Sequence, residues 1–545
     1  MKFPINKSRY SEFFLSQKSR IVVFLVFFAV LLAGLSVYKD YGISWDEQYH
    51  RRNGLVNVRY VSELLFPGSL PQYNSYPKLH DYEARDHGAV FDIALVCAEI
   101  LSGYGEGNRE LYFLRHLLTF LLFYISVFFF FLIIRNRFDS WKIGLLGCLF
   151  LVLSPRIFAE AYYNLKDITF LSLFIISIYF FIRYLNNKTY SNAVLLGLVS
   201  ALAIDVRLPG AIIPCMAIAV TAYDIIGSHQ PAGSRKKAVL TLLAYAASCA
   251  AFVILFWPYL WKDPLHSFSE AFLSMTKYQY AQYFALIYLG DIIPSSAIPW
   301  HYIPVWLVIT TPVMYTLFFA AGIGVIIHRM VKNGRGILSR EKERQDIIFL
   351  LLFLAPLMAV ILFHSNLYDG WRQMYFIYAP FLLVSMGGAN KFFQLTKKMH
   401  AHSLVIRIMN YAVIASMVLS LSSVMLWMVK NHPHQNVYFN LLAGKNAGRN
   451  FDLDYWGLSY RKALEFIAQN DKRPVIKIKA EVDQPFYNNI IMLKWMDAMR
   501  FRLAEWPEAN YFIGGYKLHP YAYPFNECYS VSVDRFKIVS VFKLR

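Results

Sequence analysis

Asp46 and Glu47 follow the first long apolar run of the chain, which extends from Ile21 to Val37. Basic residues precede that run, so the positive-inside rule predicts a cytoplasmic N-terminus and places the acidic pair on the other side of the membrane. A carboxylate at a membrane edge is costly unless water, a cation or a substrate compensates it. The pair is therefore predicted to be functional, and the alternative is an ordinary solvated loop.

Three further clusters on the predicted outer side combine carboxylates with cations. One lies in the first outer loop, the second is the string SPRIFAEAYYNLKD, and the third is YDGWR. Their polar residues are Lys78, His80, Asp86 and His87; Arg156, Glu160, Asn164, Lys166 and Asp167; and Tyr368, Asp369 and Arg372. If SPRIFAEAYYNLKD is helical, Glu160, Asn164 and Asp167 share one face at spacings i, i+4 and i+7. Asp205 and Arg207 stand between these clusters, at a membrane edge before Pro209.

These residue types fit one kind of chemistry. A carboxylate can act as the general base for a hydroxyl nucleophile. Cations can hold and neutralise a phosphate leaving group. Transfer from a lipid phosphate to an alcohol would need both. For any single Arg or Lys the alternative is headgroup binding or snorkelling, and for Tyr and Trp it is the interfacial aromatic belt.

The composition predicts a polytopic membrane protein. The 545 residues are 57% hydrophobic and only 16% charged, which is less charge than soluble proteins carry. The formal net charge of +19 would suggest a nucleic-acid partner in a soluble protein. Here it is assigned to cytoplasmic loops near anionic headgroups, so the bilayer and not nucleic acid is the expected partner. The chain has no Walker A or GxGxxG motif, and its five cysteines lack metal-ligand spacing.

Eleven apolar runs are read as membrane spans, each needing about 20 residues. They are 20–38, 111–134, 141–154, 168–185, 191–206, 209–226, 238–257, 303–328, 346–363, 374–390 and 408–429. An odd number places the C-terminus opposite the N-terminus. Every predicted inside loop is basic, for example the one containing Arg235, Lys236 and Lys237, which supports this register.

The predicted transmembrane region, 1–430, has four outer segments: 39–110, 154–167, 257–302 and 363–373. The short apolar run 89–101 is predicted to be an interfacial helix. Segment 154–167 follows a run too short to cross alone, so it is predicted to lie below the membrane surface and to line a cavity. Residues 431–545 are predicted to form a small soluble α/β domain, with a helix over 460–469 and strands at 475–480, 511–513, 529–533 and 538–543.

Several strings of the chain carry a resemblance to a known superfamily. They are SWDEQYH, DHGAVFD, SPRIFAEAYYNLKD, PWHYIPVW, YDGWRQMYFI and HPHQNVYFNLLAG with DLDYWG. With an acidic residue early in the first outer loop and Asp167 at the outer end of a span, the chain resembles the GT-C membrane glycosyltransferases. The similar branch contains the protein O-mannosyltransferases, the lipid A aminoarabinose transferases and uncharacterised bacterial members.

The resemblance implies inverting transfer of a sugar from a polyprenyl-phosphate donor at the periplasmic face of a bacterial inner membrane. By position, Asp46 matches the catalytic carboxylate, Asp167 the second acidic residue and Arg207 a phosphate-binding cation. Relatives carry a Lys-Pro-Pro-type or Glu-Lys element in the first loop that this chain lacks, so Lys78 and His87 remain alternatives for the phosphate contact. Metal use varies in the superfamily, and a divalent cation is the one cofactor considered.

The candidate residues fall into three sets. The catalytic candidates are Asp46, Glu47 and Asp167, and the donor-phosphate candidates are Lys78, His87, Arg156, Lys166, Arg207 and Arg372. The substrate-binding candidates are His80, Asp86, Asn164, His301, Tyr302, Tyr368 and Asp369.

The acceptor is expected to be a glycan, a lipid or a protein, and the C-terminal domain could bind it, recruit a partner or cap the cavity. Two other functions stay open. One is a transporter of lipids or lipid-linked sugars, although transporters usually place polar groups near the midplane. The other is a glycan polymerase or ligase with a diphosphate-linked donor.

Overall fold

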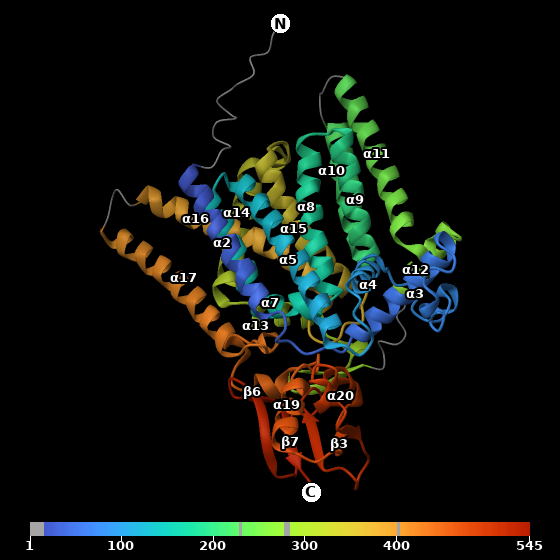
Figure 1. Cartoon of the computed structure of the whole chain (residues 1–545). Helices are drawn as coiled ribbons and strands as arrows, with labels where there is room; N and C mark the ends of the chain where they lie inside the picture. Colours follow the sequence, from blue (N-terminus) through green and yellow to red (C-terminus); the bar gives the residue numbers. More distant parts are fainter. Residues whose placement is uncertain (1–15, 228–231, 277–283, 400–403) are drawn as a thin grey trace.

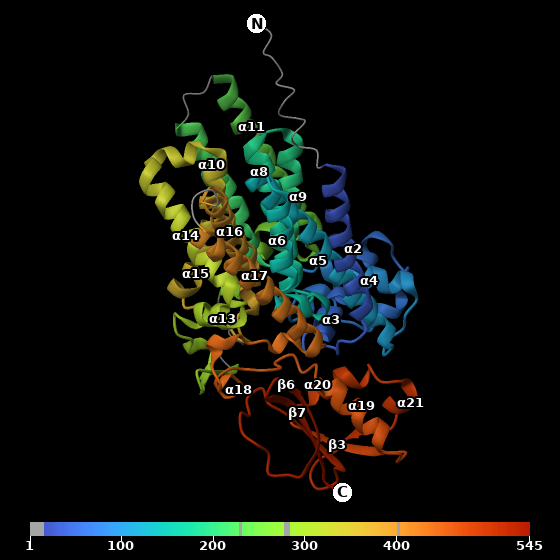
Figure 2. The same cartoon turned by 90° about the vertical axis from the view of Figure 1, so that its left-hand side faces the viewer.

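The computed structural model describes residues 16–227, 232–276, 284–399 and 404–545. A helical body forms one part, and a small domain built around a β-sheet is attached at the end opposite the N-terminus (Figures 1 and 2). The prediction of a helical membrane protein with a C-terminal α/β domain is confirmed. The basic residues Lys2, Lys7 and Arg9, on which the predicted orientation partly rests, lie outside the described residues.

Eight helices of the described residues are long and apolar enough to cross a membrane. They are α2 (Gln17–Val37), α5 (Arg109–Phe138), α8 (Asp167–Asn186), the 20-residue span Leu208–Gly227 that joins η3 (Leu208–Ala211) to α10 (Ile212–Gly227), α11 (Ala232–Phe256), α14 (Val313–Asn333), α15 (Glu341–Leu362) and α17 (Leu404–Lys430). The bent pair α6 (Trp141–Val152) and α7 (Pro155–Tyr163) is a ninth candidate. The other two predicted spans correspond to α9 (Tyr190–Val206), which has only 17 residues, and α16 (Tyr378–Met399), which is not among the eight. The count of eleven therefore stays a prediction.

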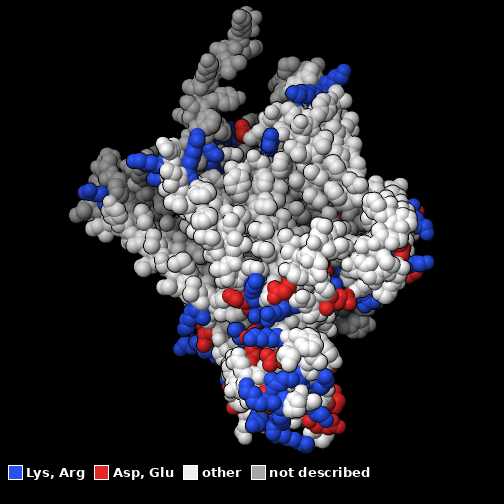
Figure 3. Space-filling view, viewed as in Figure 1, with Lys and Arg blue, Asp and Glu red and all other residues white. Residues whose placement is uncertain are grey.

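The packing of the spans suits a lipid environment. α8 is central, with 78% of its most apolar window buried, whereas α2 and α17 have 17% buried. The outward side chains are apolar, with Phe24 65% and Leu419 69% exposed. Figure 3 shows a broad belt without charged residues between two charged ends. Apolar surface of this extent on a helical body is what a bilayer covers.

Prolines stand at two helix breaks, one of them inside a predicted span. The helix predicted at 303–328 is in fact two helices, α13 (Tyr302–Thr310) and α14, because Pro312 has no N–H to continue the first one. Likewise, α7 turns by 67° from α6 at Pro155, its first residue. The run predicted as a span at 374–390 begins as a 3-10 helix, η8 (Arg372–Ile377). The outer segment 154–167 thus consists of α7 and the turn into α8, and nearly all of it is buried.

The other outer segments also contain regular structure. The helix predicted at 89–101 is α4 (Val90–Ser102), and the helix α3 (Glu47–Leu65) in the same segment was not predicted. Segment 257–302 contains α12 (Pro264–Thr276) and a hairpin of β1 (Ala285–Tyr288) and β2 (Asp291–Pro294). Its residues 277–283 lie outside the described part of the chain.

The C-terminal domain has a five-stranded sheet of order β4-β3-β5-β7-β6. The strands are β3 (Ile476–Ala480), β4 (Phe501–Leu503), β5 (Tyr511–Gly515), β6 (Glu527–Val533) and β7 (Phe536–Lys543). β3 is parallel to β4 and β5, and β7 is antiparallel to β5 and β6. The predicted helix is α19 (Tyr460–Asn470), whose apolar face packs on the sheet. Four of the five strands were predicted, and the three-residue β4 was not.

The segment between the last span and the sheet domain belongs structurally to the helical body. Ala447, Phe451 and the run Tyr455 to Leu458 share the core of the helices, whereas the separate core of the sheet domain begins at Tyr460. The helix α20 (Asp483–Ile490) extends from the sheet domain back to the loop that follows α2. This contact brings the C-terminal domain next to Asp46.

Candidate active site

A cavity of about 940 Å³ lies where the helical body meets the C-terminal domain. Its lining includes Asp46 from the loop after α2, Lys166 before α8, Arg207 after α9, Arg372 in η8 and Lys517 of the C-terminal domain. Segments that are far apart in the sequence therefore converge on one polar space. The cavity contains carboxylates and cations together, as the predicted chemistry requires.

Arg372 is the centre of the charge network. Its Nη1 lies 3.1 Å from Asp46 Oδ2 and 3.2 Å from Asp167 Oδ2, and its Nη2 lies 3.3 Å from Asp369 Oδ2. The side chain is only 5% exposed, and its guanidinium lies 4.5 Å from the ring centroid of Trp456. A buried guanidinium is tolerated where carboxylates and an aromatic face surround it. Arg372 thus ties three of the candidate carboxylates to one point.

Asp167 has a second cation and an amide neighbour. Arg207 Nη2 forms an ion pair with Asp167 Oδ1. Asn164 Nδ2 donates to Asp167 Oδ2 at 3.0 Å and to Glu160 Oε2 at 2.7 Å, and the backbone N–H of Asp167 donates to Asn164 Oδ1. The expectation that these residues share one helix face is wrong, because α7 ends at Tyr163 and α8 begins at Asp167. The break itself lets the Asn164 amide join the two carboxylates.

Glu160 lies deeper than the cavity. Its Oε1 accepts hydrogen bonds from Tyr375 at 2.7 Å and from Tyr455 at 2.9 Å, and the side chain is fully buried. These bonds connect α7 to η8 and to the segment after α17. Glu160 is therefore placed to hold three segments together behind Asp167.

The acidic pair divides into two different environments. Asp46 lines the cavity, and its side chain is 32% exposed. Glu47 is fully buried, where Oε2 accepts from the backbone N–H of Ser44 at 2.6 Å and Oε1 lies 2.9 Å from His116 Nε2. The structure places Glu47 at the start of α3 as a helix-terminal contact, away from the cavity lining. Only Asp46 is positioned to reach a substrate.

Lys166 and His87 line the same side of the cavity. Burial, with a contribution from the Arg207 charge, lowers the pKa of Lys166 to about 8. Burial and the Lys166 charge also lower the pKa of His87, although its bond to Asp86 opposes this. His87 is therefore neutral at pH 7, and Lys166 is mostly protonated. Lys78 is exposed and does not line the cavity, so of these two alternatives the structure brings His87 to the site.

Gly88 seats the first outer loop against α9. A Cβ at this position would overlap the backbone carbonyl oxygen of Asp205. The Asp205 carboxylate accepts a hydrogen bond from the backbone N–H of Val90 at 2.8 Å. A residue without a side chain lets the two backbones approach this closely. The DHG sequence thereby fixes His87 beside Lys166.

Several predicted residues lie elsewhere. Arg156 donates from Nε to the carbonyl of Tyr438 at 3.1 Å and lies between the rings of Trp306 and Phe439, at 5.2 and 4.9 Å from their centroids. It does not line the cavity, so the structure does not bring it to the other donor-phosphate candidates.

Three ring residues are also absent from the cavity lining. His301 Nδ1 lies 2.6 Å from the hydroxyl of Tyr288 in the β1–β2 hairpin. His80 packs on the rings of Tyr60 and Tyr259, and Tyr302 is buried under Tyr288. Of the remaining substrate-binding candidates, Tyr368 and Asp369 line the cavity, and Asp86 contacts the lining residue His87. Asn164 lies behind the lining, where it bonds to Asp167, the partner of Arg207 and Arg372.

The C-terminal domain contributes residues that were not predicted. Lys517 Nζ lies 2.7 Å from Asp369 Oδ1. Asn488 Nδ2 donates to the carbonyl of Ser44 at 2.8 Å, and Asn489 Oδ1 accepts from the N–H of Ile43 at 3.1 Å. These bonds hold the backbone two and three residues before Asp46. No local spacing marks these residues in the sequence, because the domain's contact with the first loop is purely tertiary.

Residues 112–261 match the model of the dolichyl-phosphate-mannose-protein mannosyltransferase family. The predicted GT-C resemblance is confirmed. No curated protein shows significant sequence similarity to the chain. The family match includes Lys166, Asp167 and Arg207, whereas Asp46 and Arg372 lie outside it.

Two solved structures of the oligosaccharyltransferase of Archaeoglobus fulgidus are similar to the chain. One is AglB in complex with an inhibitory peptide and a dolichol-phosphate, at 13% identity and a TM-score of 0.48, covering 94% of this chain and 62% of that chain. The other is tethered to an acceptor peptide through a disulfide bond, at 14% identity and a TM-score of 0.42, covering 92% and 61%. The chain thus spans less than two thirds of the length of these structures.

The GT-C resemblance implies three residues at the site, and all three line or contact the same cavity. Asp46 and Arg207 line it, and Asp167 pairs with Arg207 at its wall. Within the described residues, no group of three or more His, Cys, Asp or Glu side chains is arranged to hold a metal ion. The carboxylates at the site are instead joined by Arg372, Arg207 and Lys517. A divalent cation remains a prediction without an assigned site.

Proposed function

We propose that the protein is an inverting glycosyltransferase that moves a sugar from a polyprenyl-phosphate donor to an acceptor hydroxyl. The observation that carries the proposal is the placement of one partly exposed carboxylate, Asp46, against a buried arginine, Arg372, in a cavity that also contains Lys166 and Arg207. A base for the acceptor and cations for a phosphate leaving group are thus adjacent. The family match to residues 112–261 supports the glycosyltransferase class.

The donor phosphate would bind among Arg372, Arg207 and Lys166. Arginine suits a phosphate because its planar fork can make two charge-assisted hydrogen bonds and keeps its proton. Apolar side chains from the ends of spans line the same cavity, including Val206, Leu208 and Val360. These would let a polyprenyl chain pass from the cavity into the lipid.

The reaction follows from this arrangement. Asp46 would accept the proton of the acceptor hydroxyl as its oxygen attacks the anomeric carbon. The bond from that carbon to the phosphate oxygen breaks, and its electron pair leaves with the polyprenyl phosphate, which the cations neutralise. Attack opposite the leaving group inverts the configuration at the anomeric carbon.

The acceptor would approach from the side of the C-terminal domain. Glu481, Tyr516 and Lys517 of that domain line the cavity, facing Trp45 and Tyr49 of the helical body. Trp45 and Tyr49 are each 38% exposed, and their rings contact Lys517 and His87, respectively. Carboxylates and aromatic rings can bind a hydroxyl-rich acceptor, whether it is a glycan, a lipid or a protein.

The proposed orientation has the N-terminus in the cytoplasm and the cavity and C-terminal domain in the periplasm of a bacterial inner membrane. The end of the helical body nearest the N-terminus displays mainly Lys and Arg (Figure 3). The opposite end carries charges of both signs (Figure 3). An excess of basic residues is the property of cytoplasmic loops.

The direct test is a transfer assay with the purified full-length protein in nanodiscs. A panel of polyprenyl-phosphate sugars is supplied with envelope extracts as acceptors, and release of polyprenyl phosphate is measured with the anomeric configuration of the product. The sugar to be tested first is the one that mass spectrometry finds missing from the envelope glycans of a deletion strain. Release of polyprenyl phosphate with an inverted product is expected, and Asp46→Asn should abolish it.

Two outcomes would overturn the proposal. Movement of intact donor across proteoliposomes without bond cleavage would indicate a transporter. Turnover only with diphosphate-linked donors would indicate a polymerase or ligase.

A further inference from the structure

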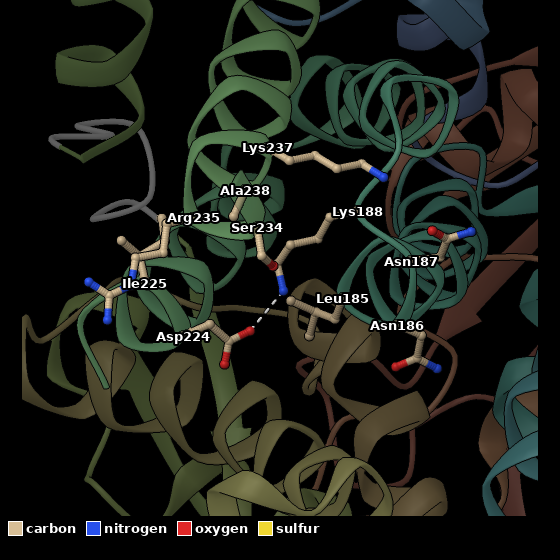
Figure 4. A pocket seen from close by; sticks show the side chains of 10 residues that line it. All are labelled: Leu185, Asn186, Asn187, Lys188, Asp224, Ile225, Ser234, Arg235, Lys237 and Ala238. Carbon is tan, nitrogen blue, oxygen red and sulfur yellow. Dashed lines mark hydrogen bonds and ion pairs between the residues drawn. The ribbon is translucent and has the colours of Figure 1, made fainter. Parts of the chain in front are cut away.

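A second cavity lies at the other end of the helical body. It has a volume of about 280 Å³ and is formed by the link that follows α8, the end of α10 and the first turns of α11 (Figure 4). α8 has Asp167 at the candidate active site and Asn186 at this pocket. A helix of that length spans about 30 Å, the thickness of the hydrocarbon core. The pocket therefore opens at the opposite membrane surface from the active-site cavity.

The pocket has an excess of positive charge. Asp224 is the one carboxylate among its lining residues, and both of its oxygens are paired. Lys188 Nζ lies 2.8 Å from Oδ2, and Arg344 Nη1 lies 2.9 Å from Oδ1. Arg235 and Lys237 on α11 add two more cations to the lining. Three cations and one carboxylate thus line the pocket, and Arg344 pairs with that carboxylate from outside the lining.

The neutral groups of the pocket suit an oxyanion. Asn186, Asn187 and Ser234 add amide and hydroxyl groups to the lining, and Ser234 lies beside Lys188 (Figure 4). Phosphate oxygens are bound by this combination of charge-assisted and neutral hydrogen bonds. At about 30 Å³ for each water molecule, the volume holds about nine waters, which is enough for a phosphate and part of its glycerol.

We propose that this pocket binds the phosphate of an anionic phospholipid in the leaflet opposite the candidate active site. Basic pockets between membrane-spanning helices on the cytoplasmic side are known to bind such headgroups. Leu185 and Ile225 give the pocket an apolar wall between spans, which suits the glycerol end of a lipid more than a soluble phosphate compound. The bound headgroup would join the α8–α9 link to the α10–α11 pair.

The experiment compares two adjacent lysines of α11. Lys237 lines the pocket, whereas Lys236 is also exposed and does not. The full-length protein and the variants Lys237→Gln and Lys236→Gln are titrated with phosphatidylglycerol in detergent. Binding is followed by native mass spectrometry and by the shift in thermal stability. Phosphatidylcholine, inorganic phosphate and glycerol 3-phosphate are the parallel probes.

Phosphatidylglycerol should bind and stabilise the wild-type protein, and phosphatidylcholine should do so much less. Lys237→Gln should weaken phosphatidylglycerol binding about fivefold, the effect expected for one basic residue near an anionic surface, and Lys236→Gln should not. Equal stabilisation by glycerol 3-phosphate would overturn the lipid assignment in favour of a soluble phosphate. If both variants lost phosphatidylglycerol affinity equally, or if neither lost any, the pocket would have no specific role in lipid binding. Sugar transfer is not measured, so this result does not depend on the proposed reaction.

Discussion

Arg372 Nη1 lies 3.1 Å from Asp46 Oδ2, and the same nitrogen lies 3.2 Å from Asp167. Arg372 follows the ninth predicted span, whereas Asp46 follows the first predicted span. Only the packing of the helical body brings these two residues together. In the proposed reaction Asp46 receives the acceptor proton and Arg372 binds the departing phosphate. Their contact would place the proposed general base next to the proposed phosphate-binding cation.

Replacing Asp46 by Asn should remove the general base and lower the transfer rate by about 10²–10⁴-fold. Folding should be little affected, because the Asp46 side chain is 32% exposed. Turnover with a defined donor is the measurement. Glu47→Gln is the matched control, since it should lower thermal stability through its contacts with Ser44 and His116. Near-wild-type turnover of Asp46→Asn would disprove the assignment.

The substitutions Arg207→Lys and Arg372→Lys should lower kcat/KM, because lysine keeps the charge and loses the bidentate fork. The alanine variants should be worse, since a charge-assisted hydrogen bond is worth about 1.5–3 kcal/mol. Arg207 is the cleaner test. Its side chain is 20% exposed and pairs with one carboxylate, whereas Arg372 neutralises three and its loss should also destabilise the unliganded protein.

The readout for Arg207 is the stabilisation conferred by added polyprenyl phosphate. Arg207→Ala should unfold at nearly the wild-type temperature without ligand and should gain little when ligand is added. Full ligand-induced stabilisation in Arg207→Ala and Arg372→Ala would move the donor phosphate to other cations, with Lys166 as the next candidate.

Donor affinity should fall as the pH rises through about 8, the pKa of Lys166. With that pKa, about 90% of Lys166 is protonated at pH 7 and about 10% at pH 9, while both arginines stay charged.

The free energy of unfolding should rise over the pH range in which donor affinity falls. Because the folded pKa of Lys166 lies below the usual lysine value of 10.5, the unfolded chain binds more protons between these two values, and stability rises with pH across that window.

Donor titrations at pH 7 and pH 9 test the role of Lys166. Lys166→Arg should remove most of the pH dependence, since arginine does not deprotonate in this range. A pH dependence that survives this change would assign the titration to another group.

Asn488→Ala should lower kcat and leave donor binding unchanged. Its amide holds the Ser44 carbonyl at 2.8 Å, two residues before Asp46, and it does not line the cavity. Loss of one hydrogen bond of about 1 kcal/mol should reduce turnover about fivefold, because Asp46 would be held less firmly in its reactive position. Asn470→Ala is the control, because its amide only bonds the end of its own helix. Unchanged turnover in Asn488→Ala would show that Asp46 is held by other contacts.

A reporter fused after Arg545 should be active only if it functions outside the cytoplasm. The predicted odd number of spans, together with the predicted cytoplasmic N-terminus, implies this location. Reporter activity in the cytoplasm would place every candidate site residue on the wrong side of the membrane.

The sequence by itself determined the class of the protein, because apolar runs, basic loops and strand alternation are local patterns. It also identified Asp46, Asp167 and Arg207 as candidates, whereas of the segment 154–167, which was predicted to line a cavity, only Lys166 does so. The tertiary structure decided which candidates meet. It separated Asp46 from Glu47, because α3 begins between them and buries the second carboxylate. It also kept Arg156 out of the cavity that Arg372 lines, a difference that residue type and spacing did not show.

The helix break after Tyr163 and the contact of Asn488 with Ser44 were likewise beyond the sequence. The helix break depends on which faces of α7 and α8 pack in the core. The second joins residues from the two ends of the chain. Such contacts depend on packing between distant segments, which leaves no periodic signal in either segment alone.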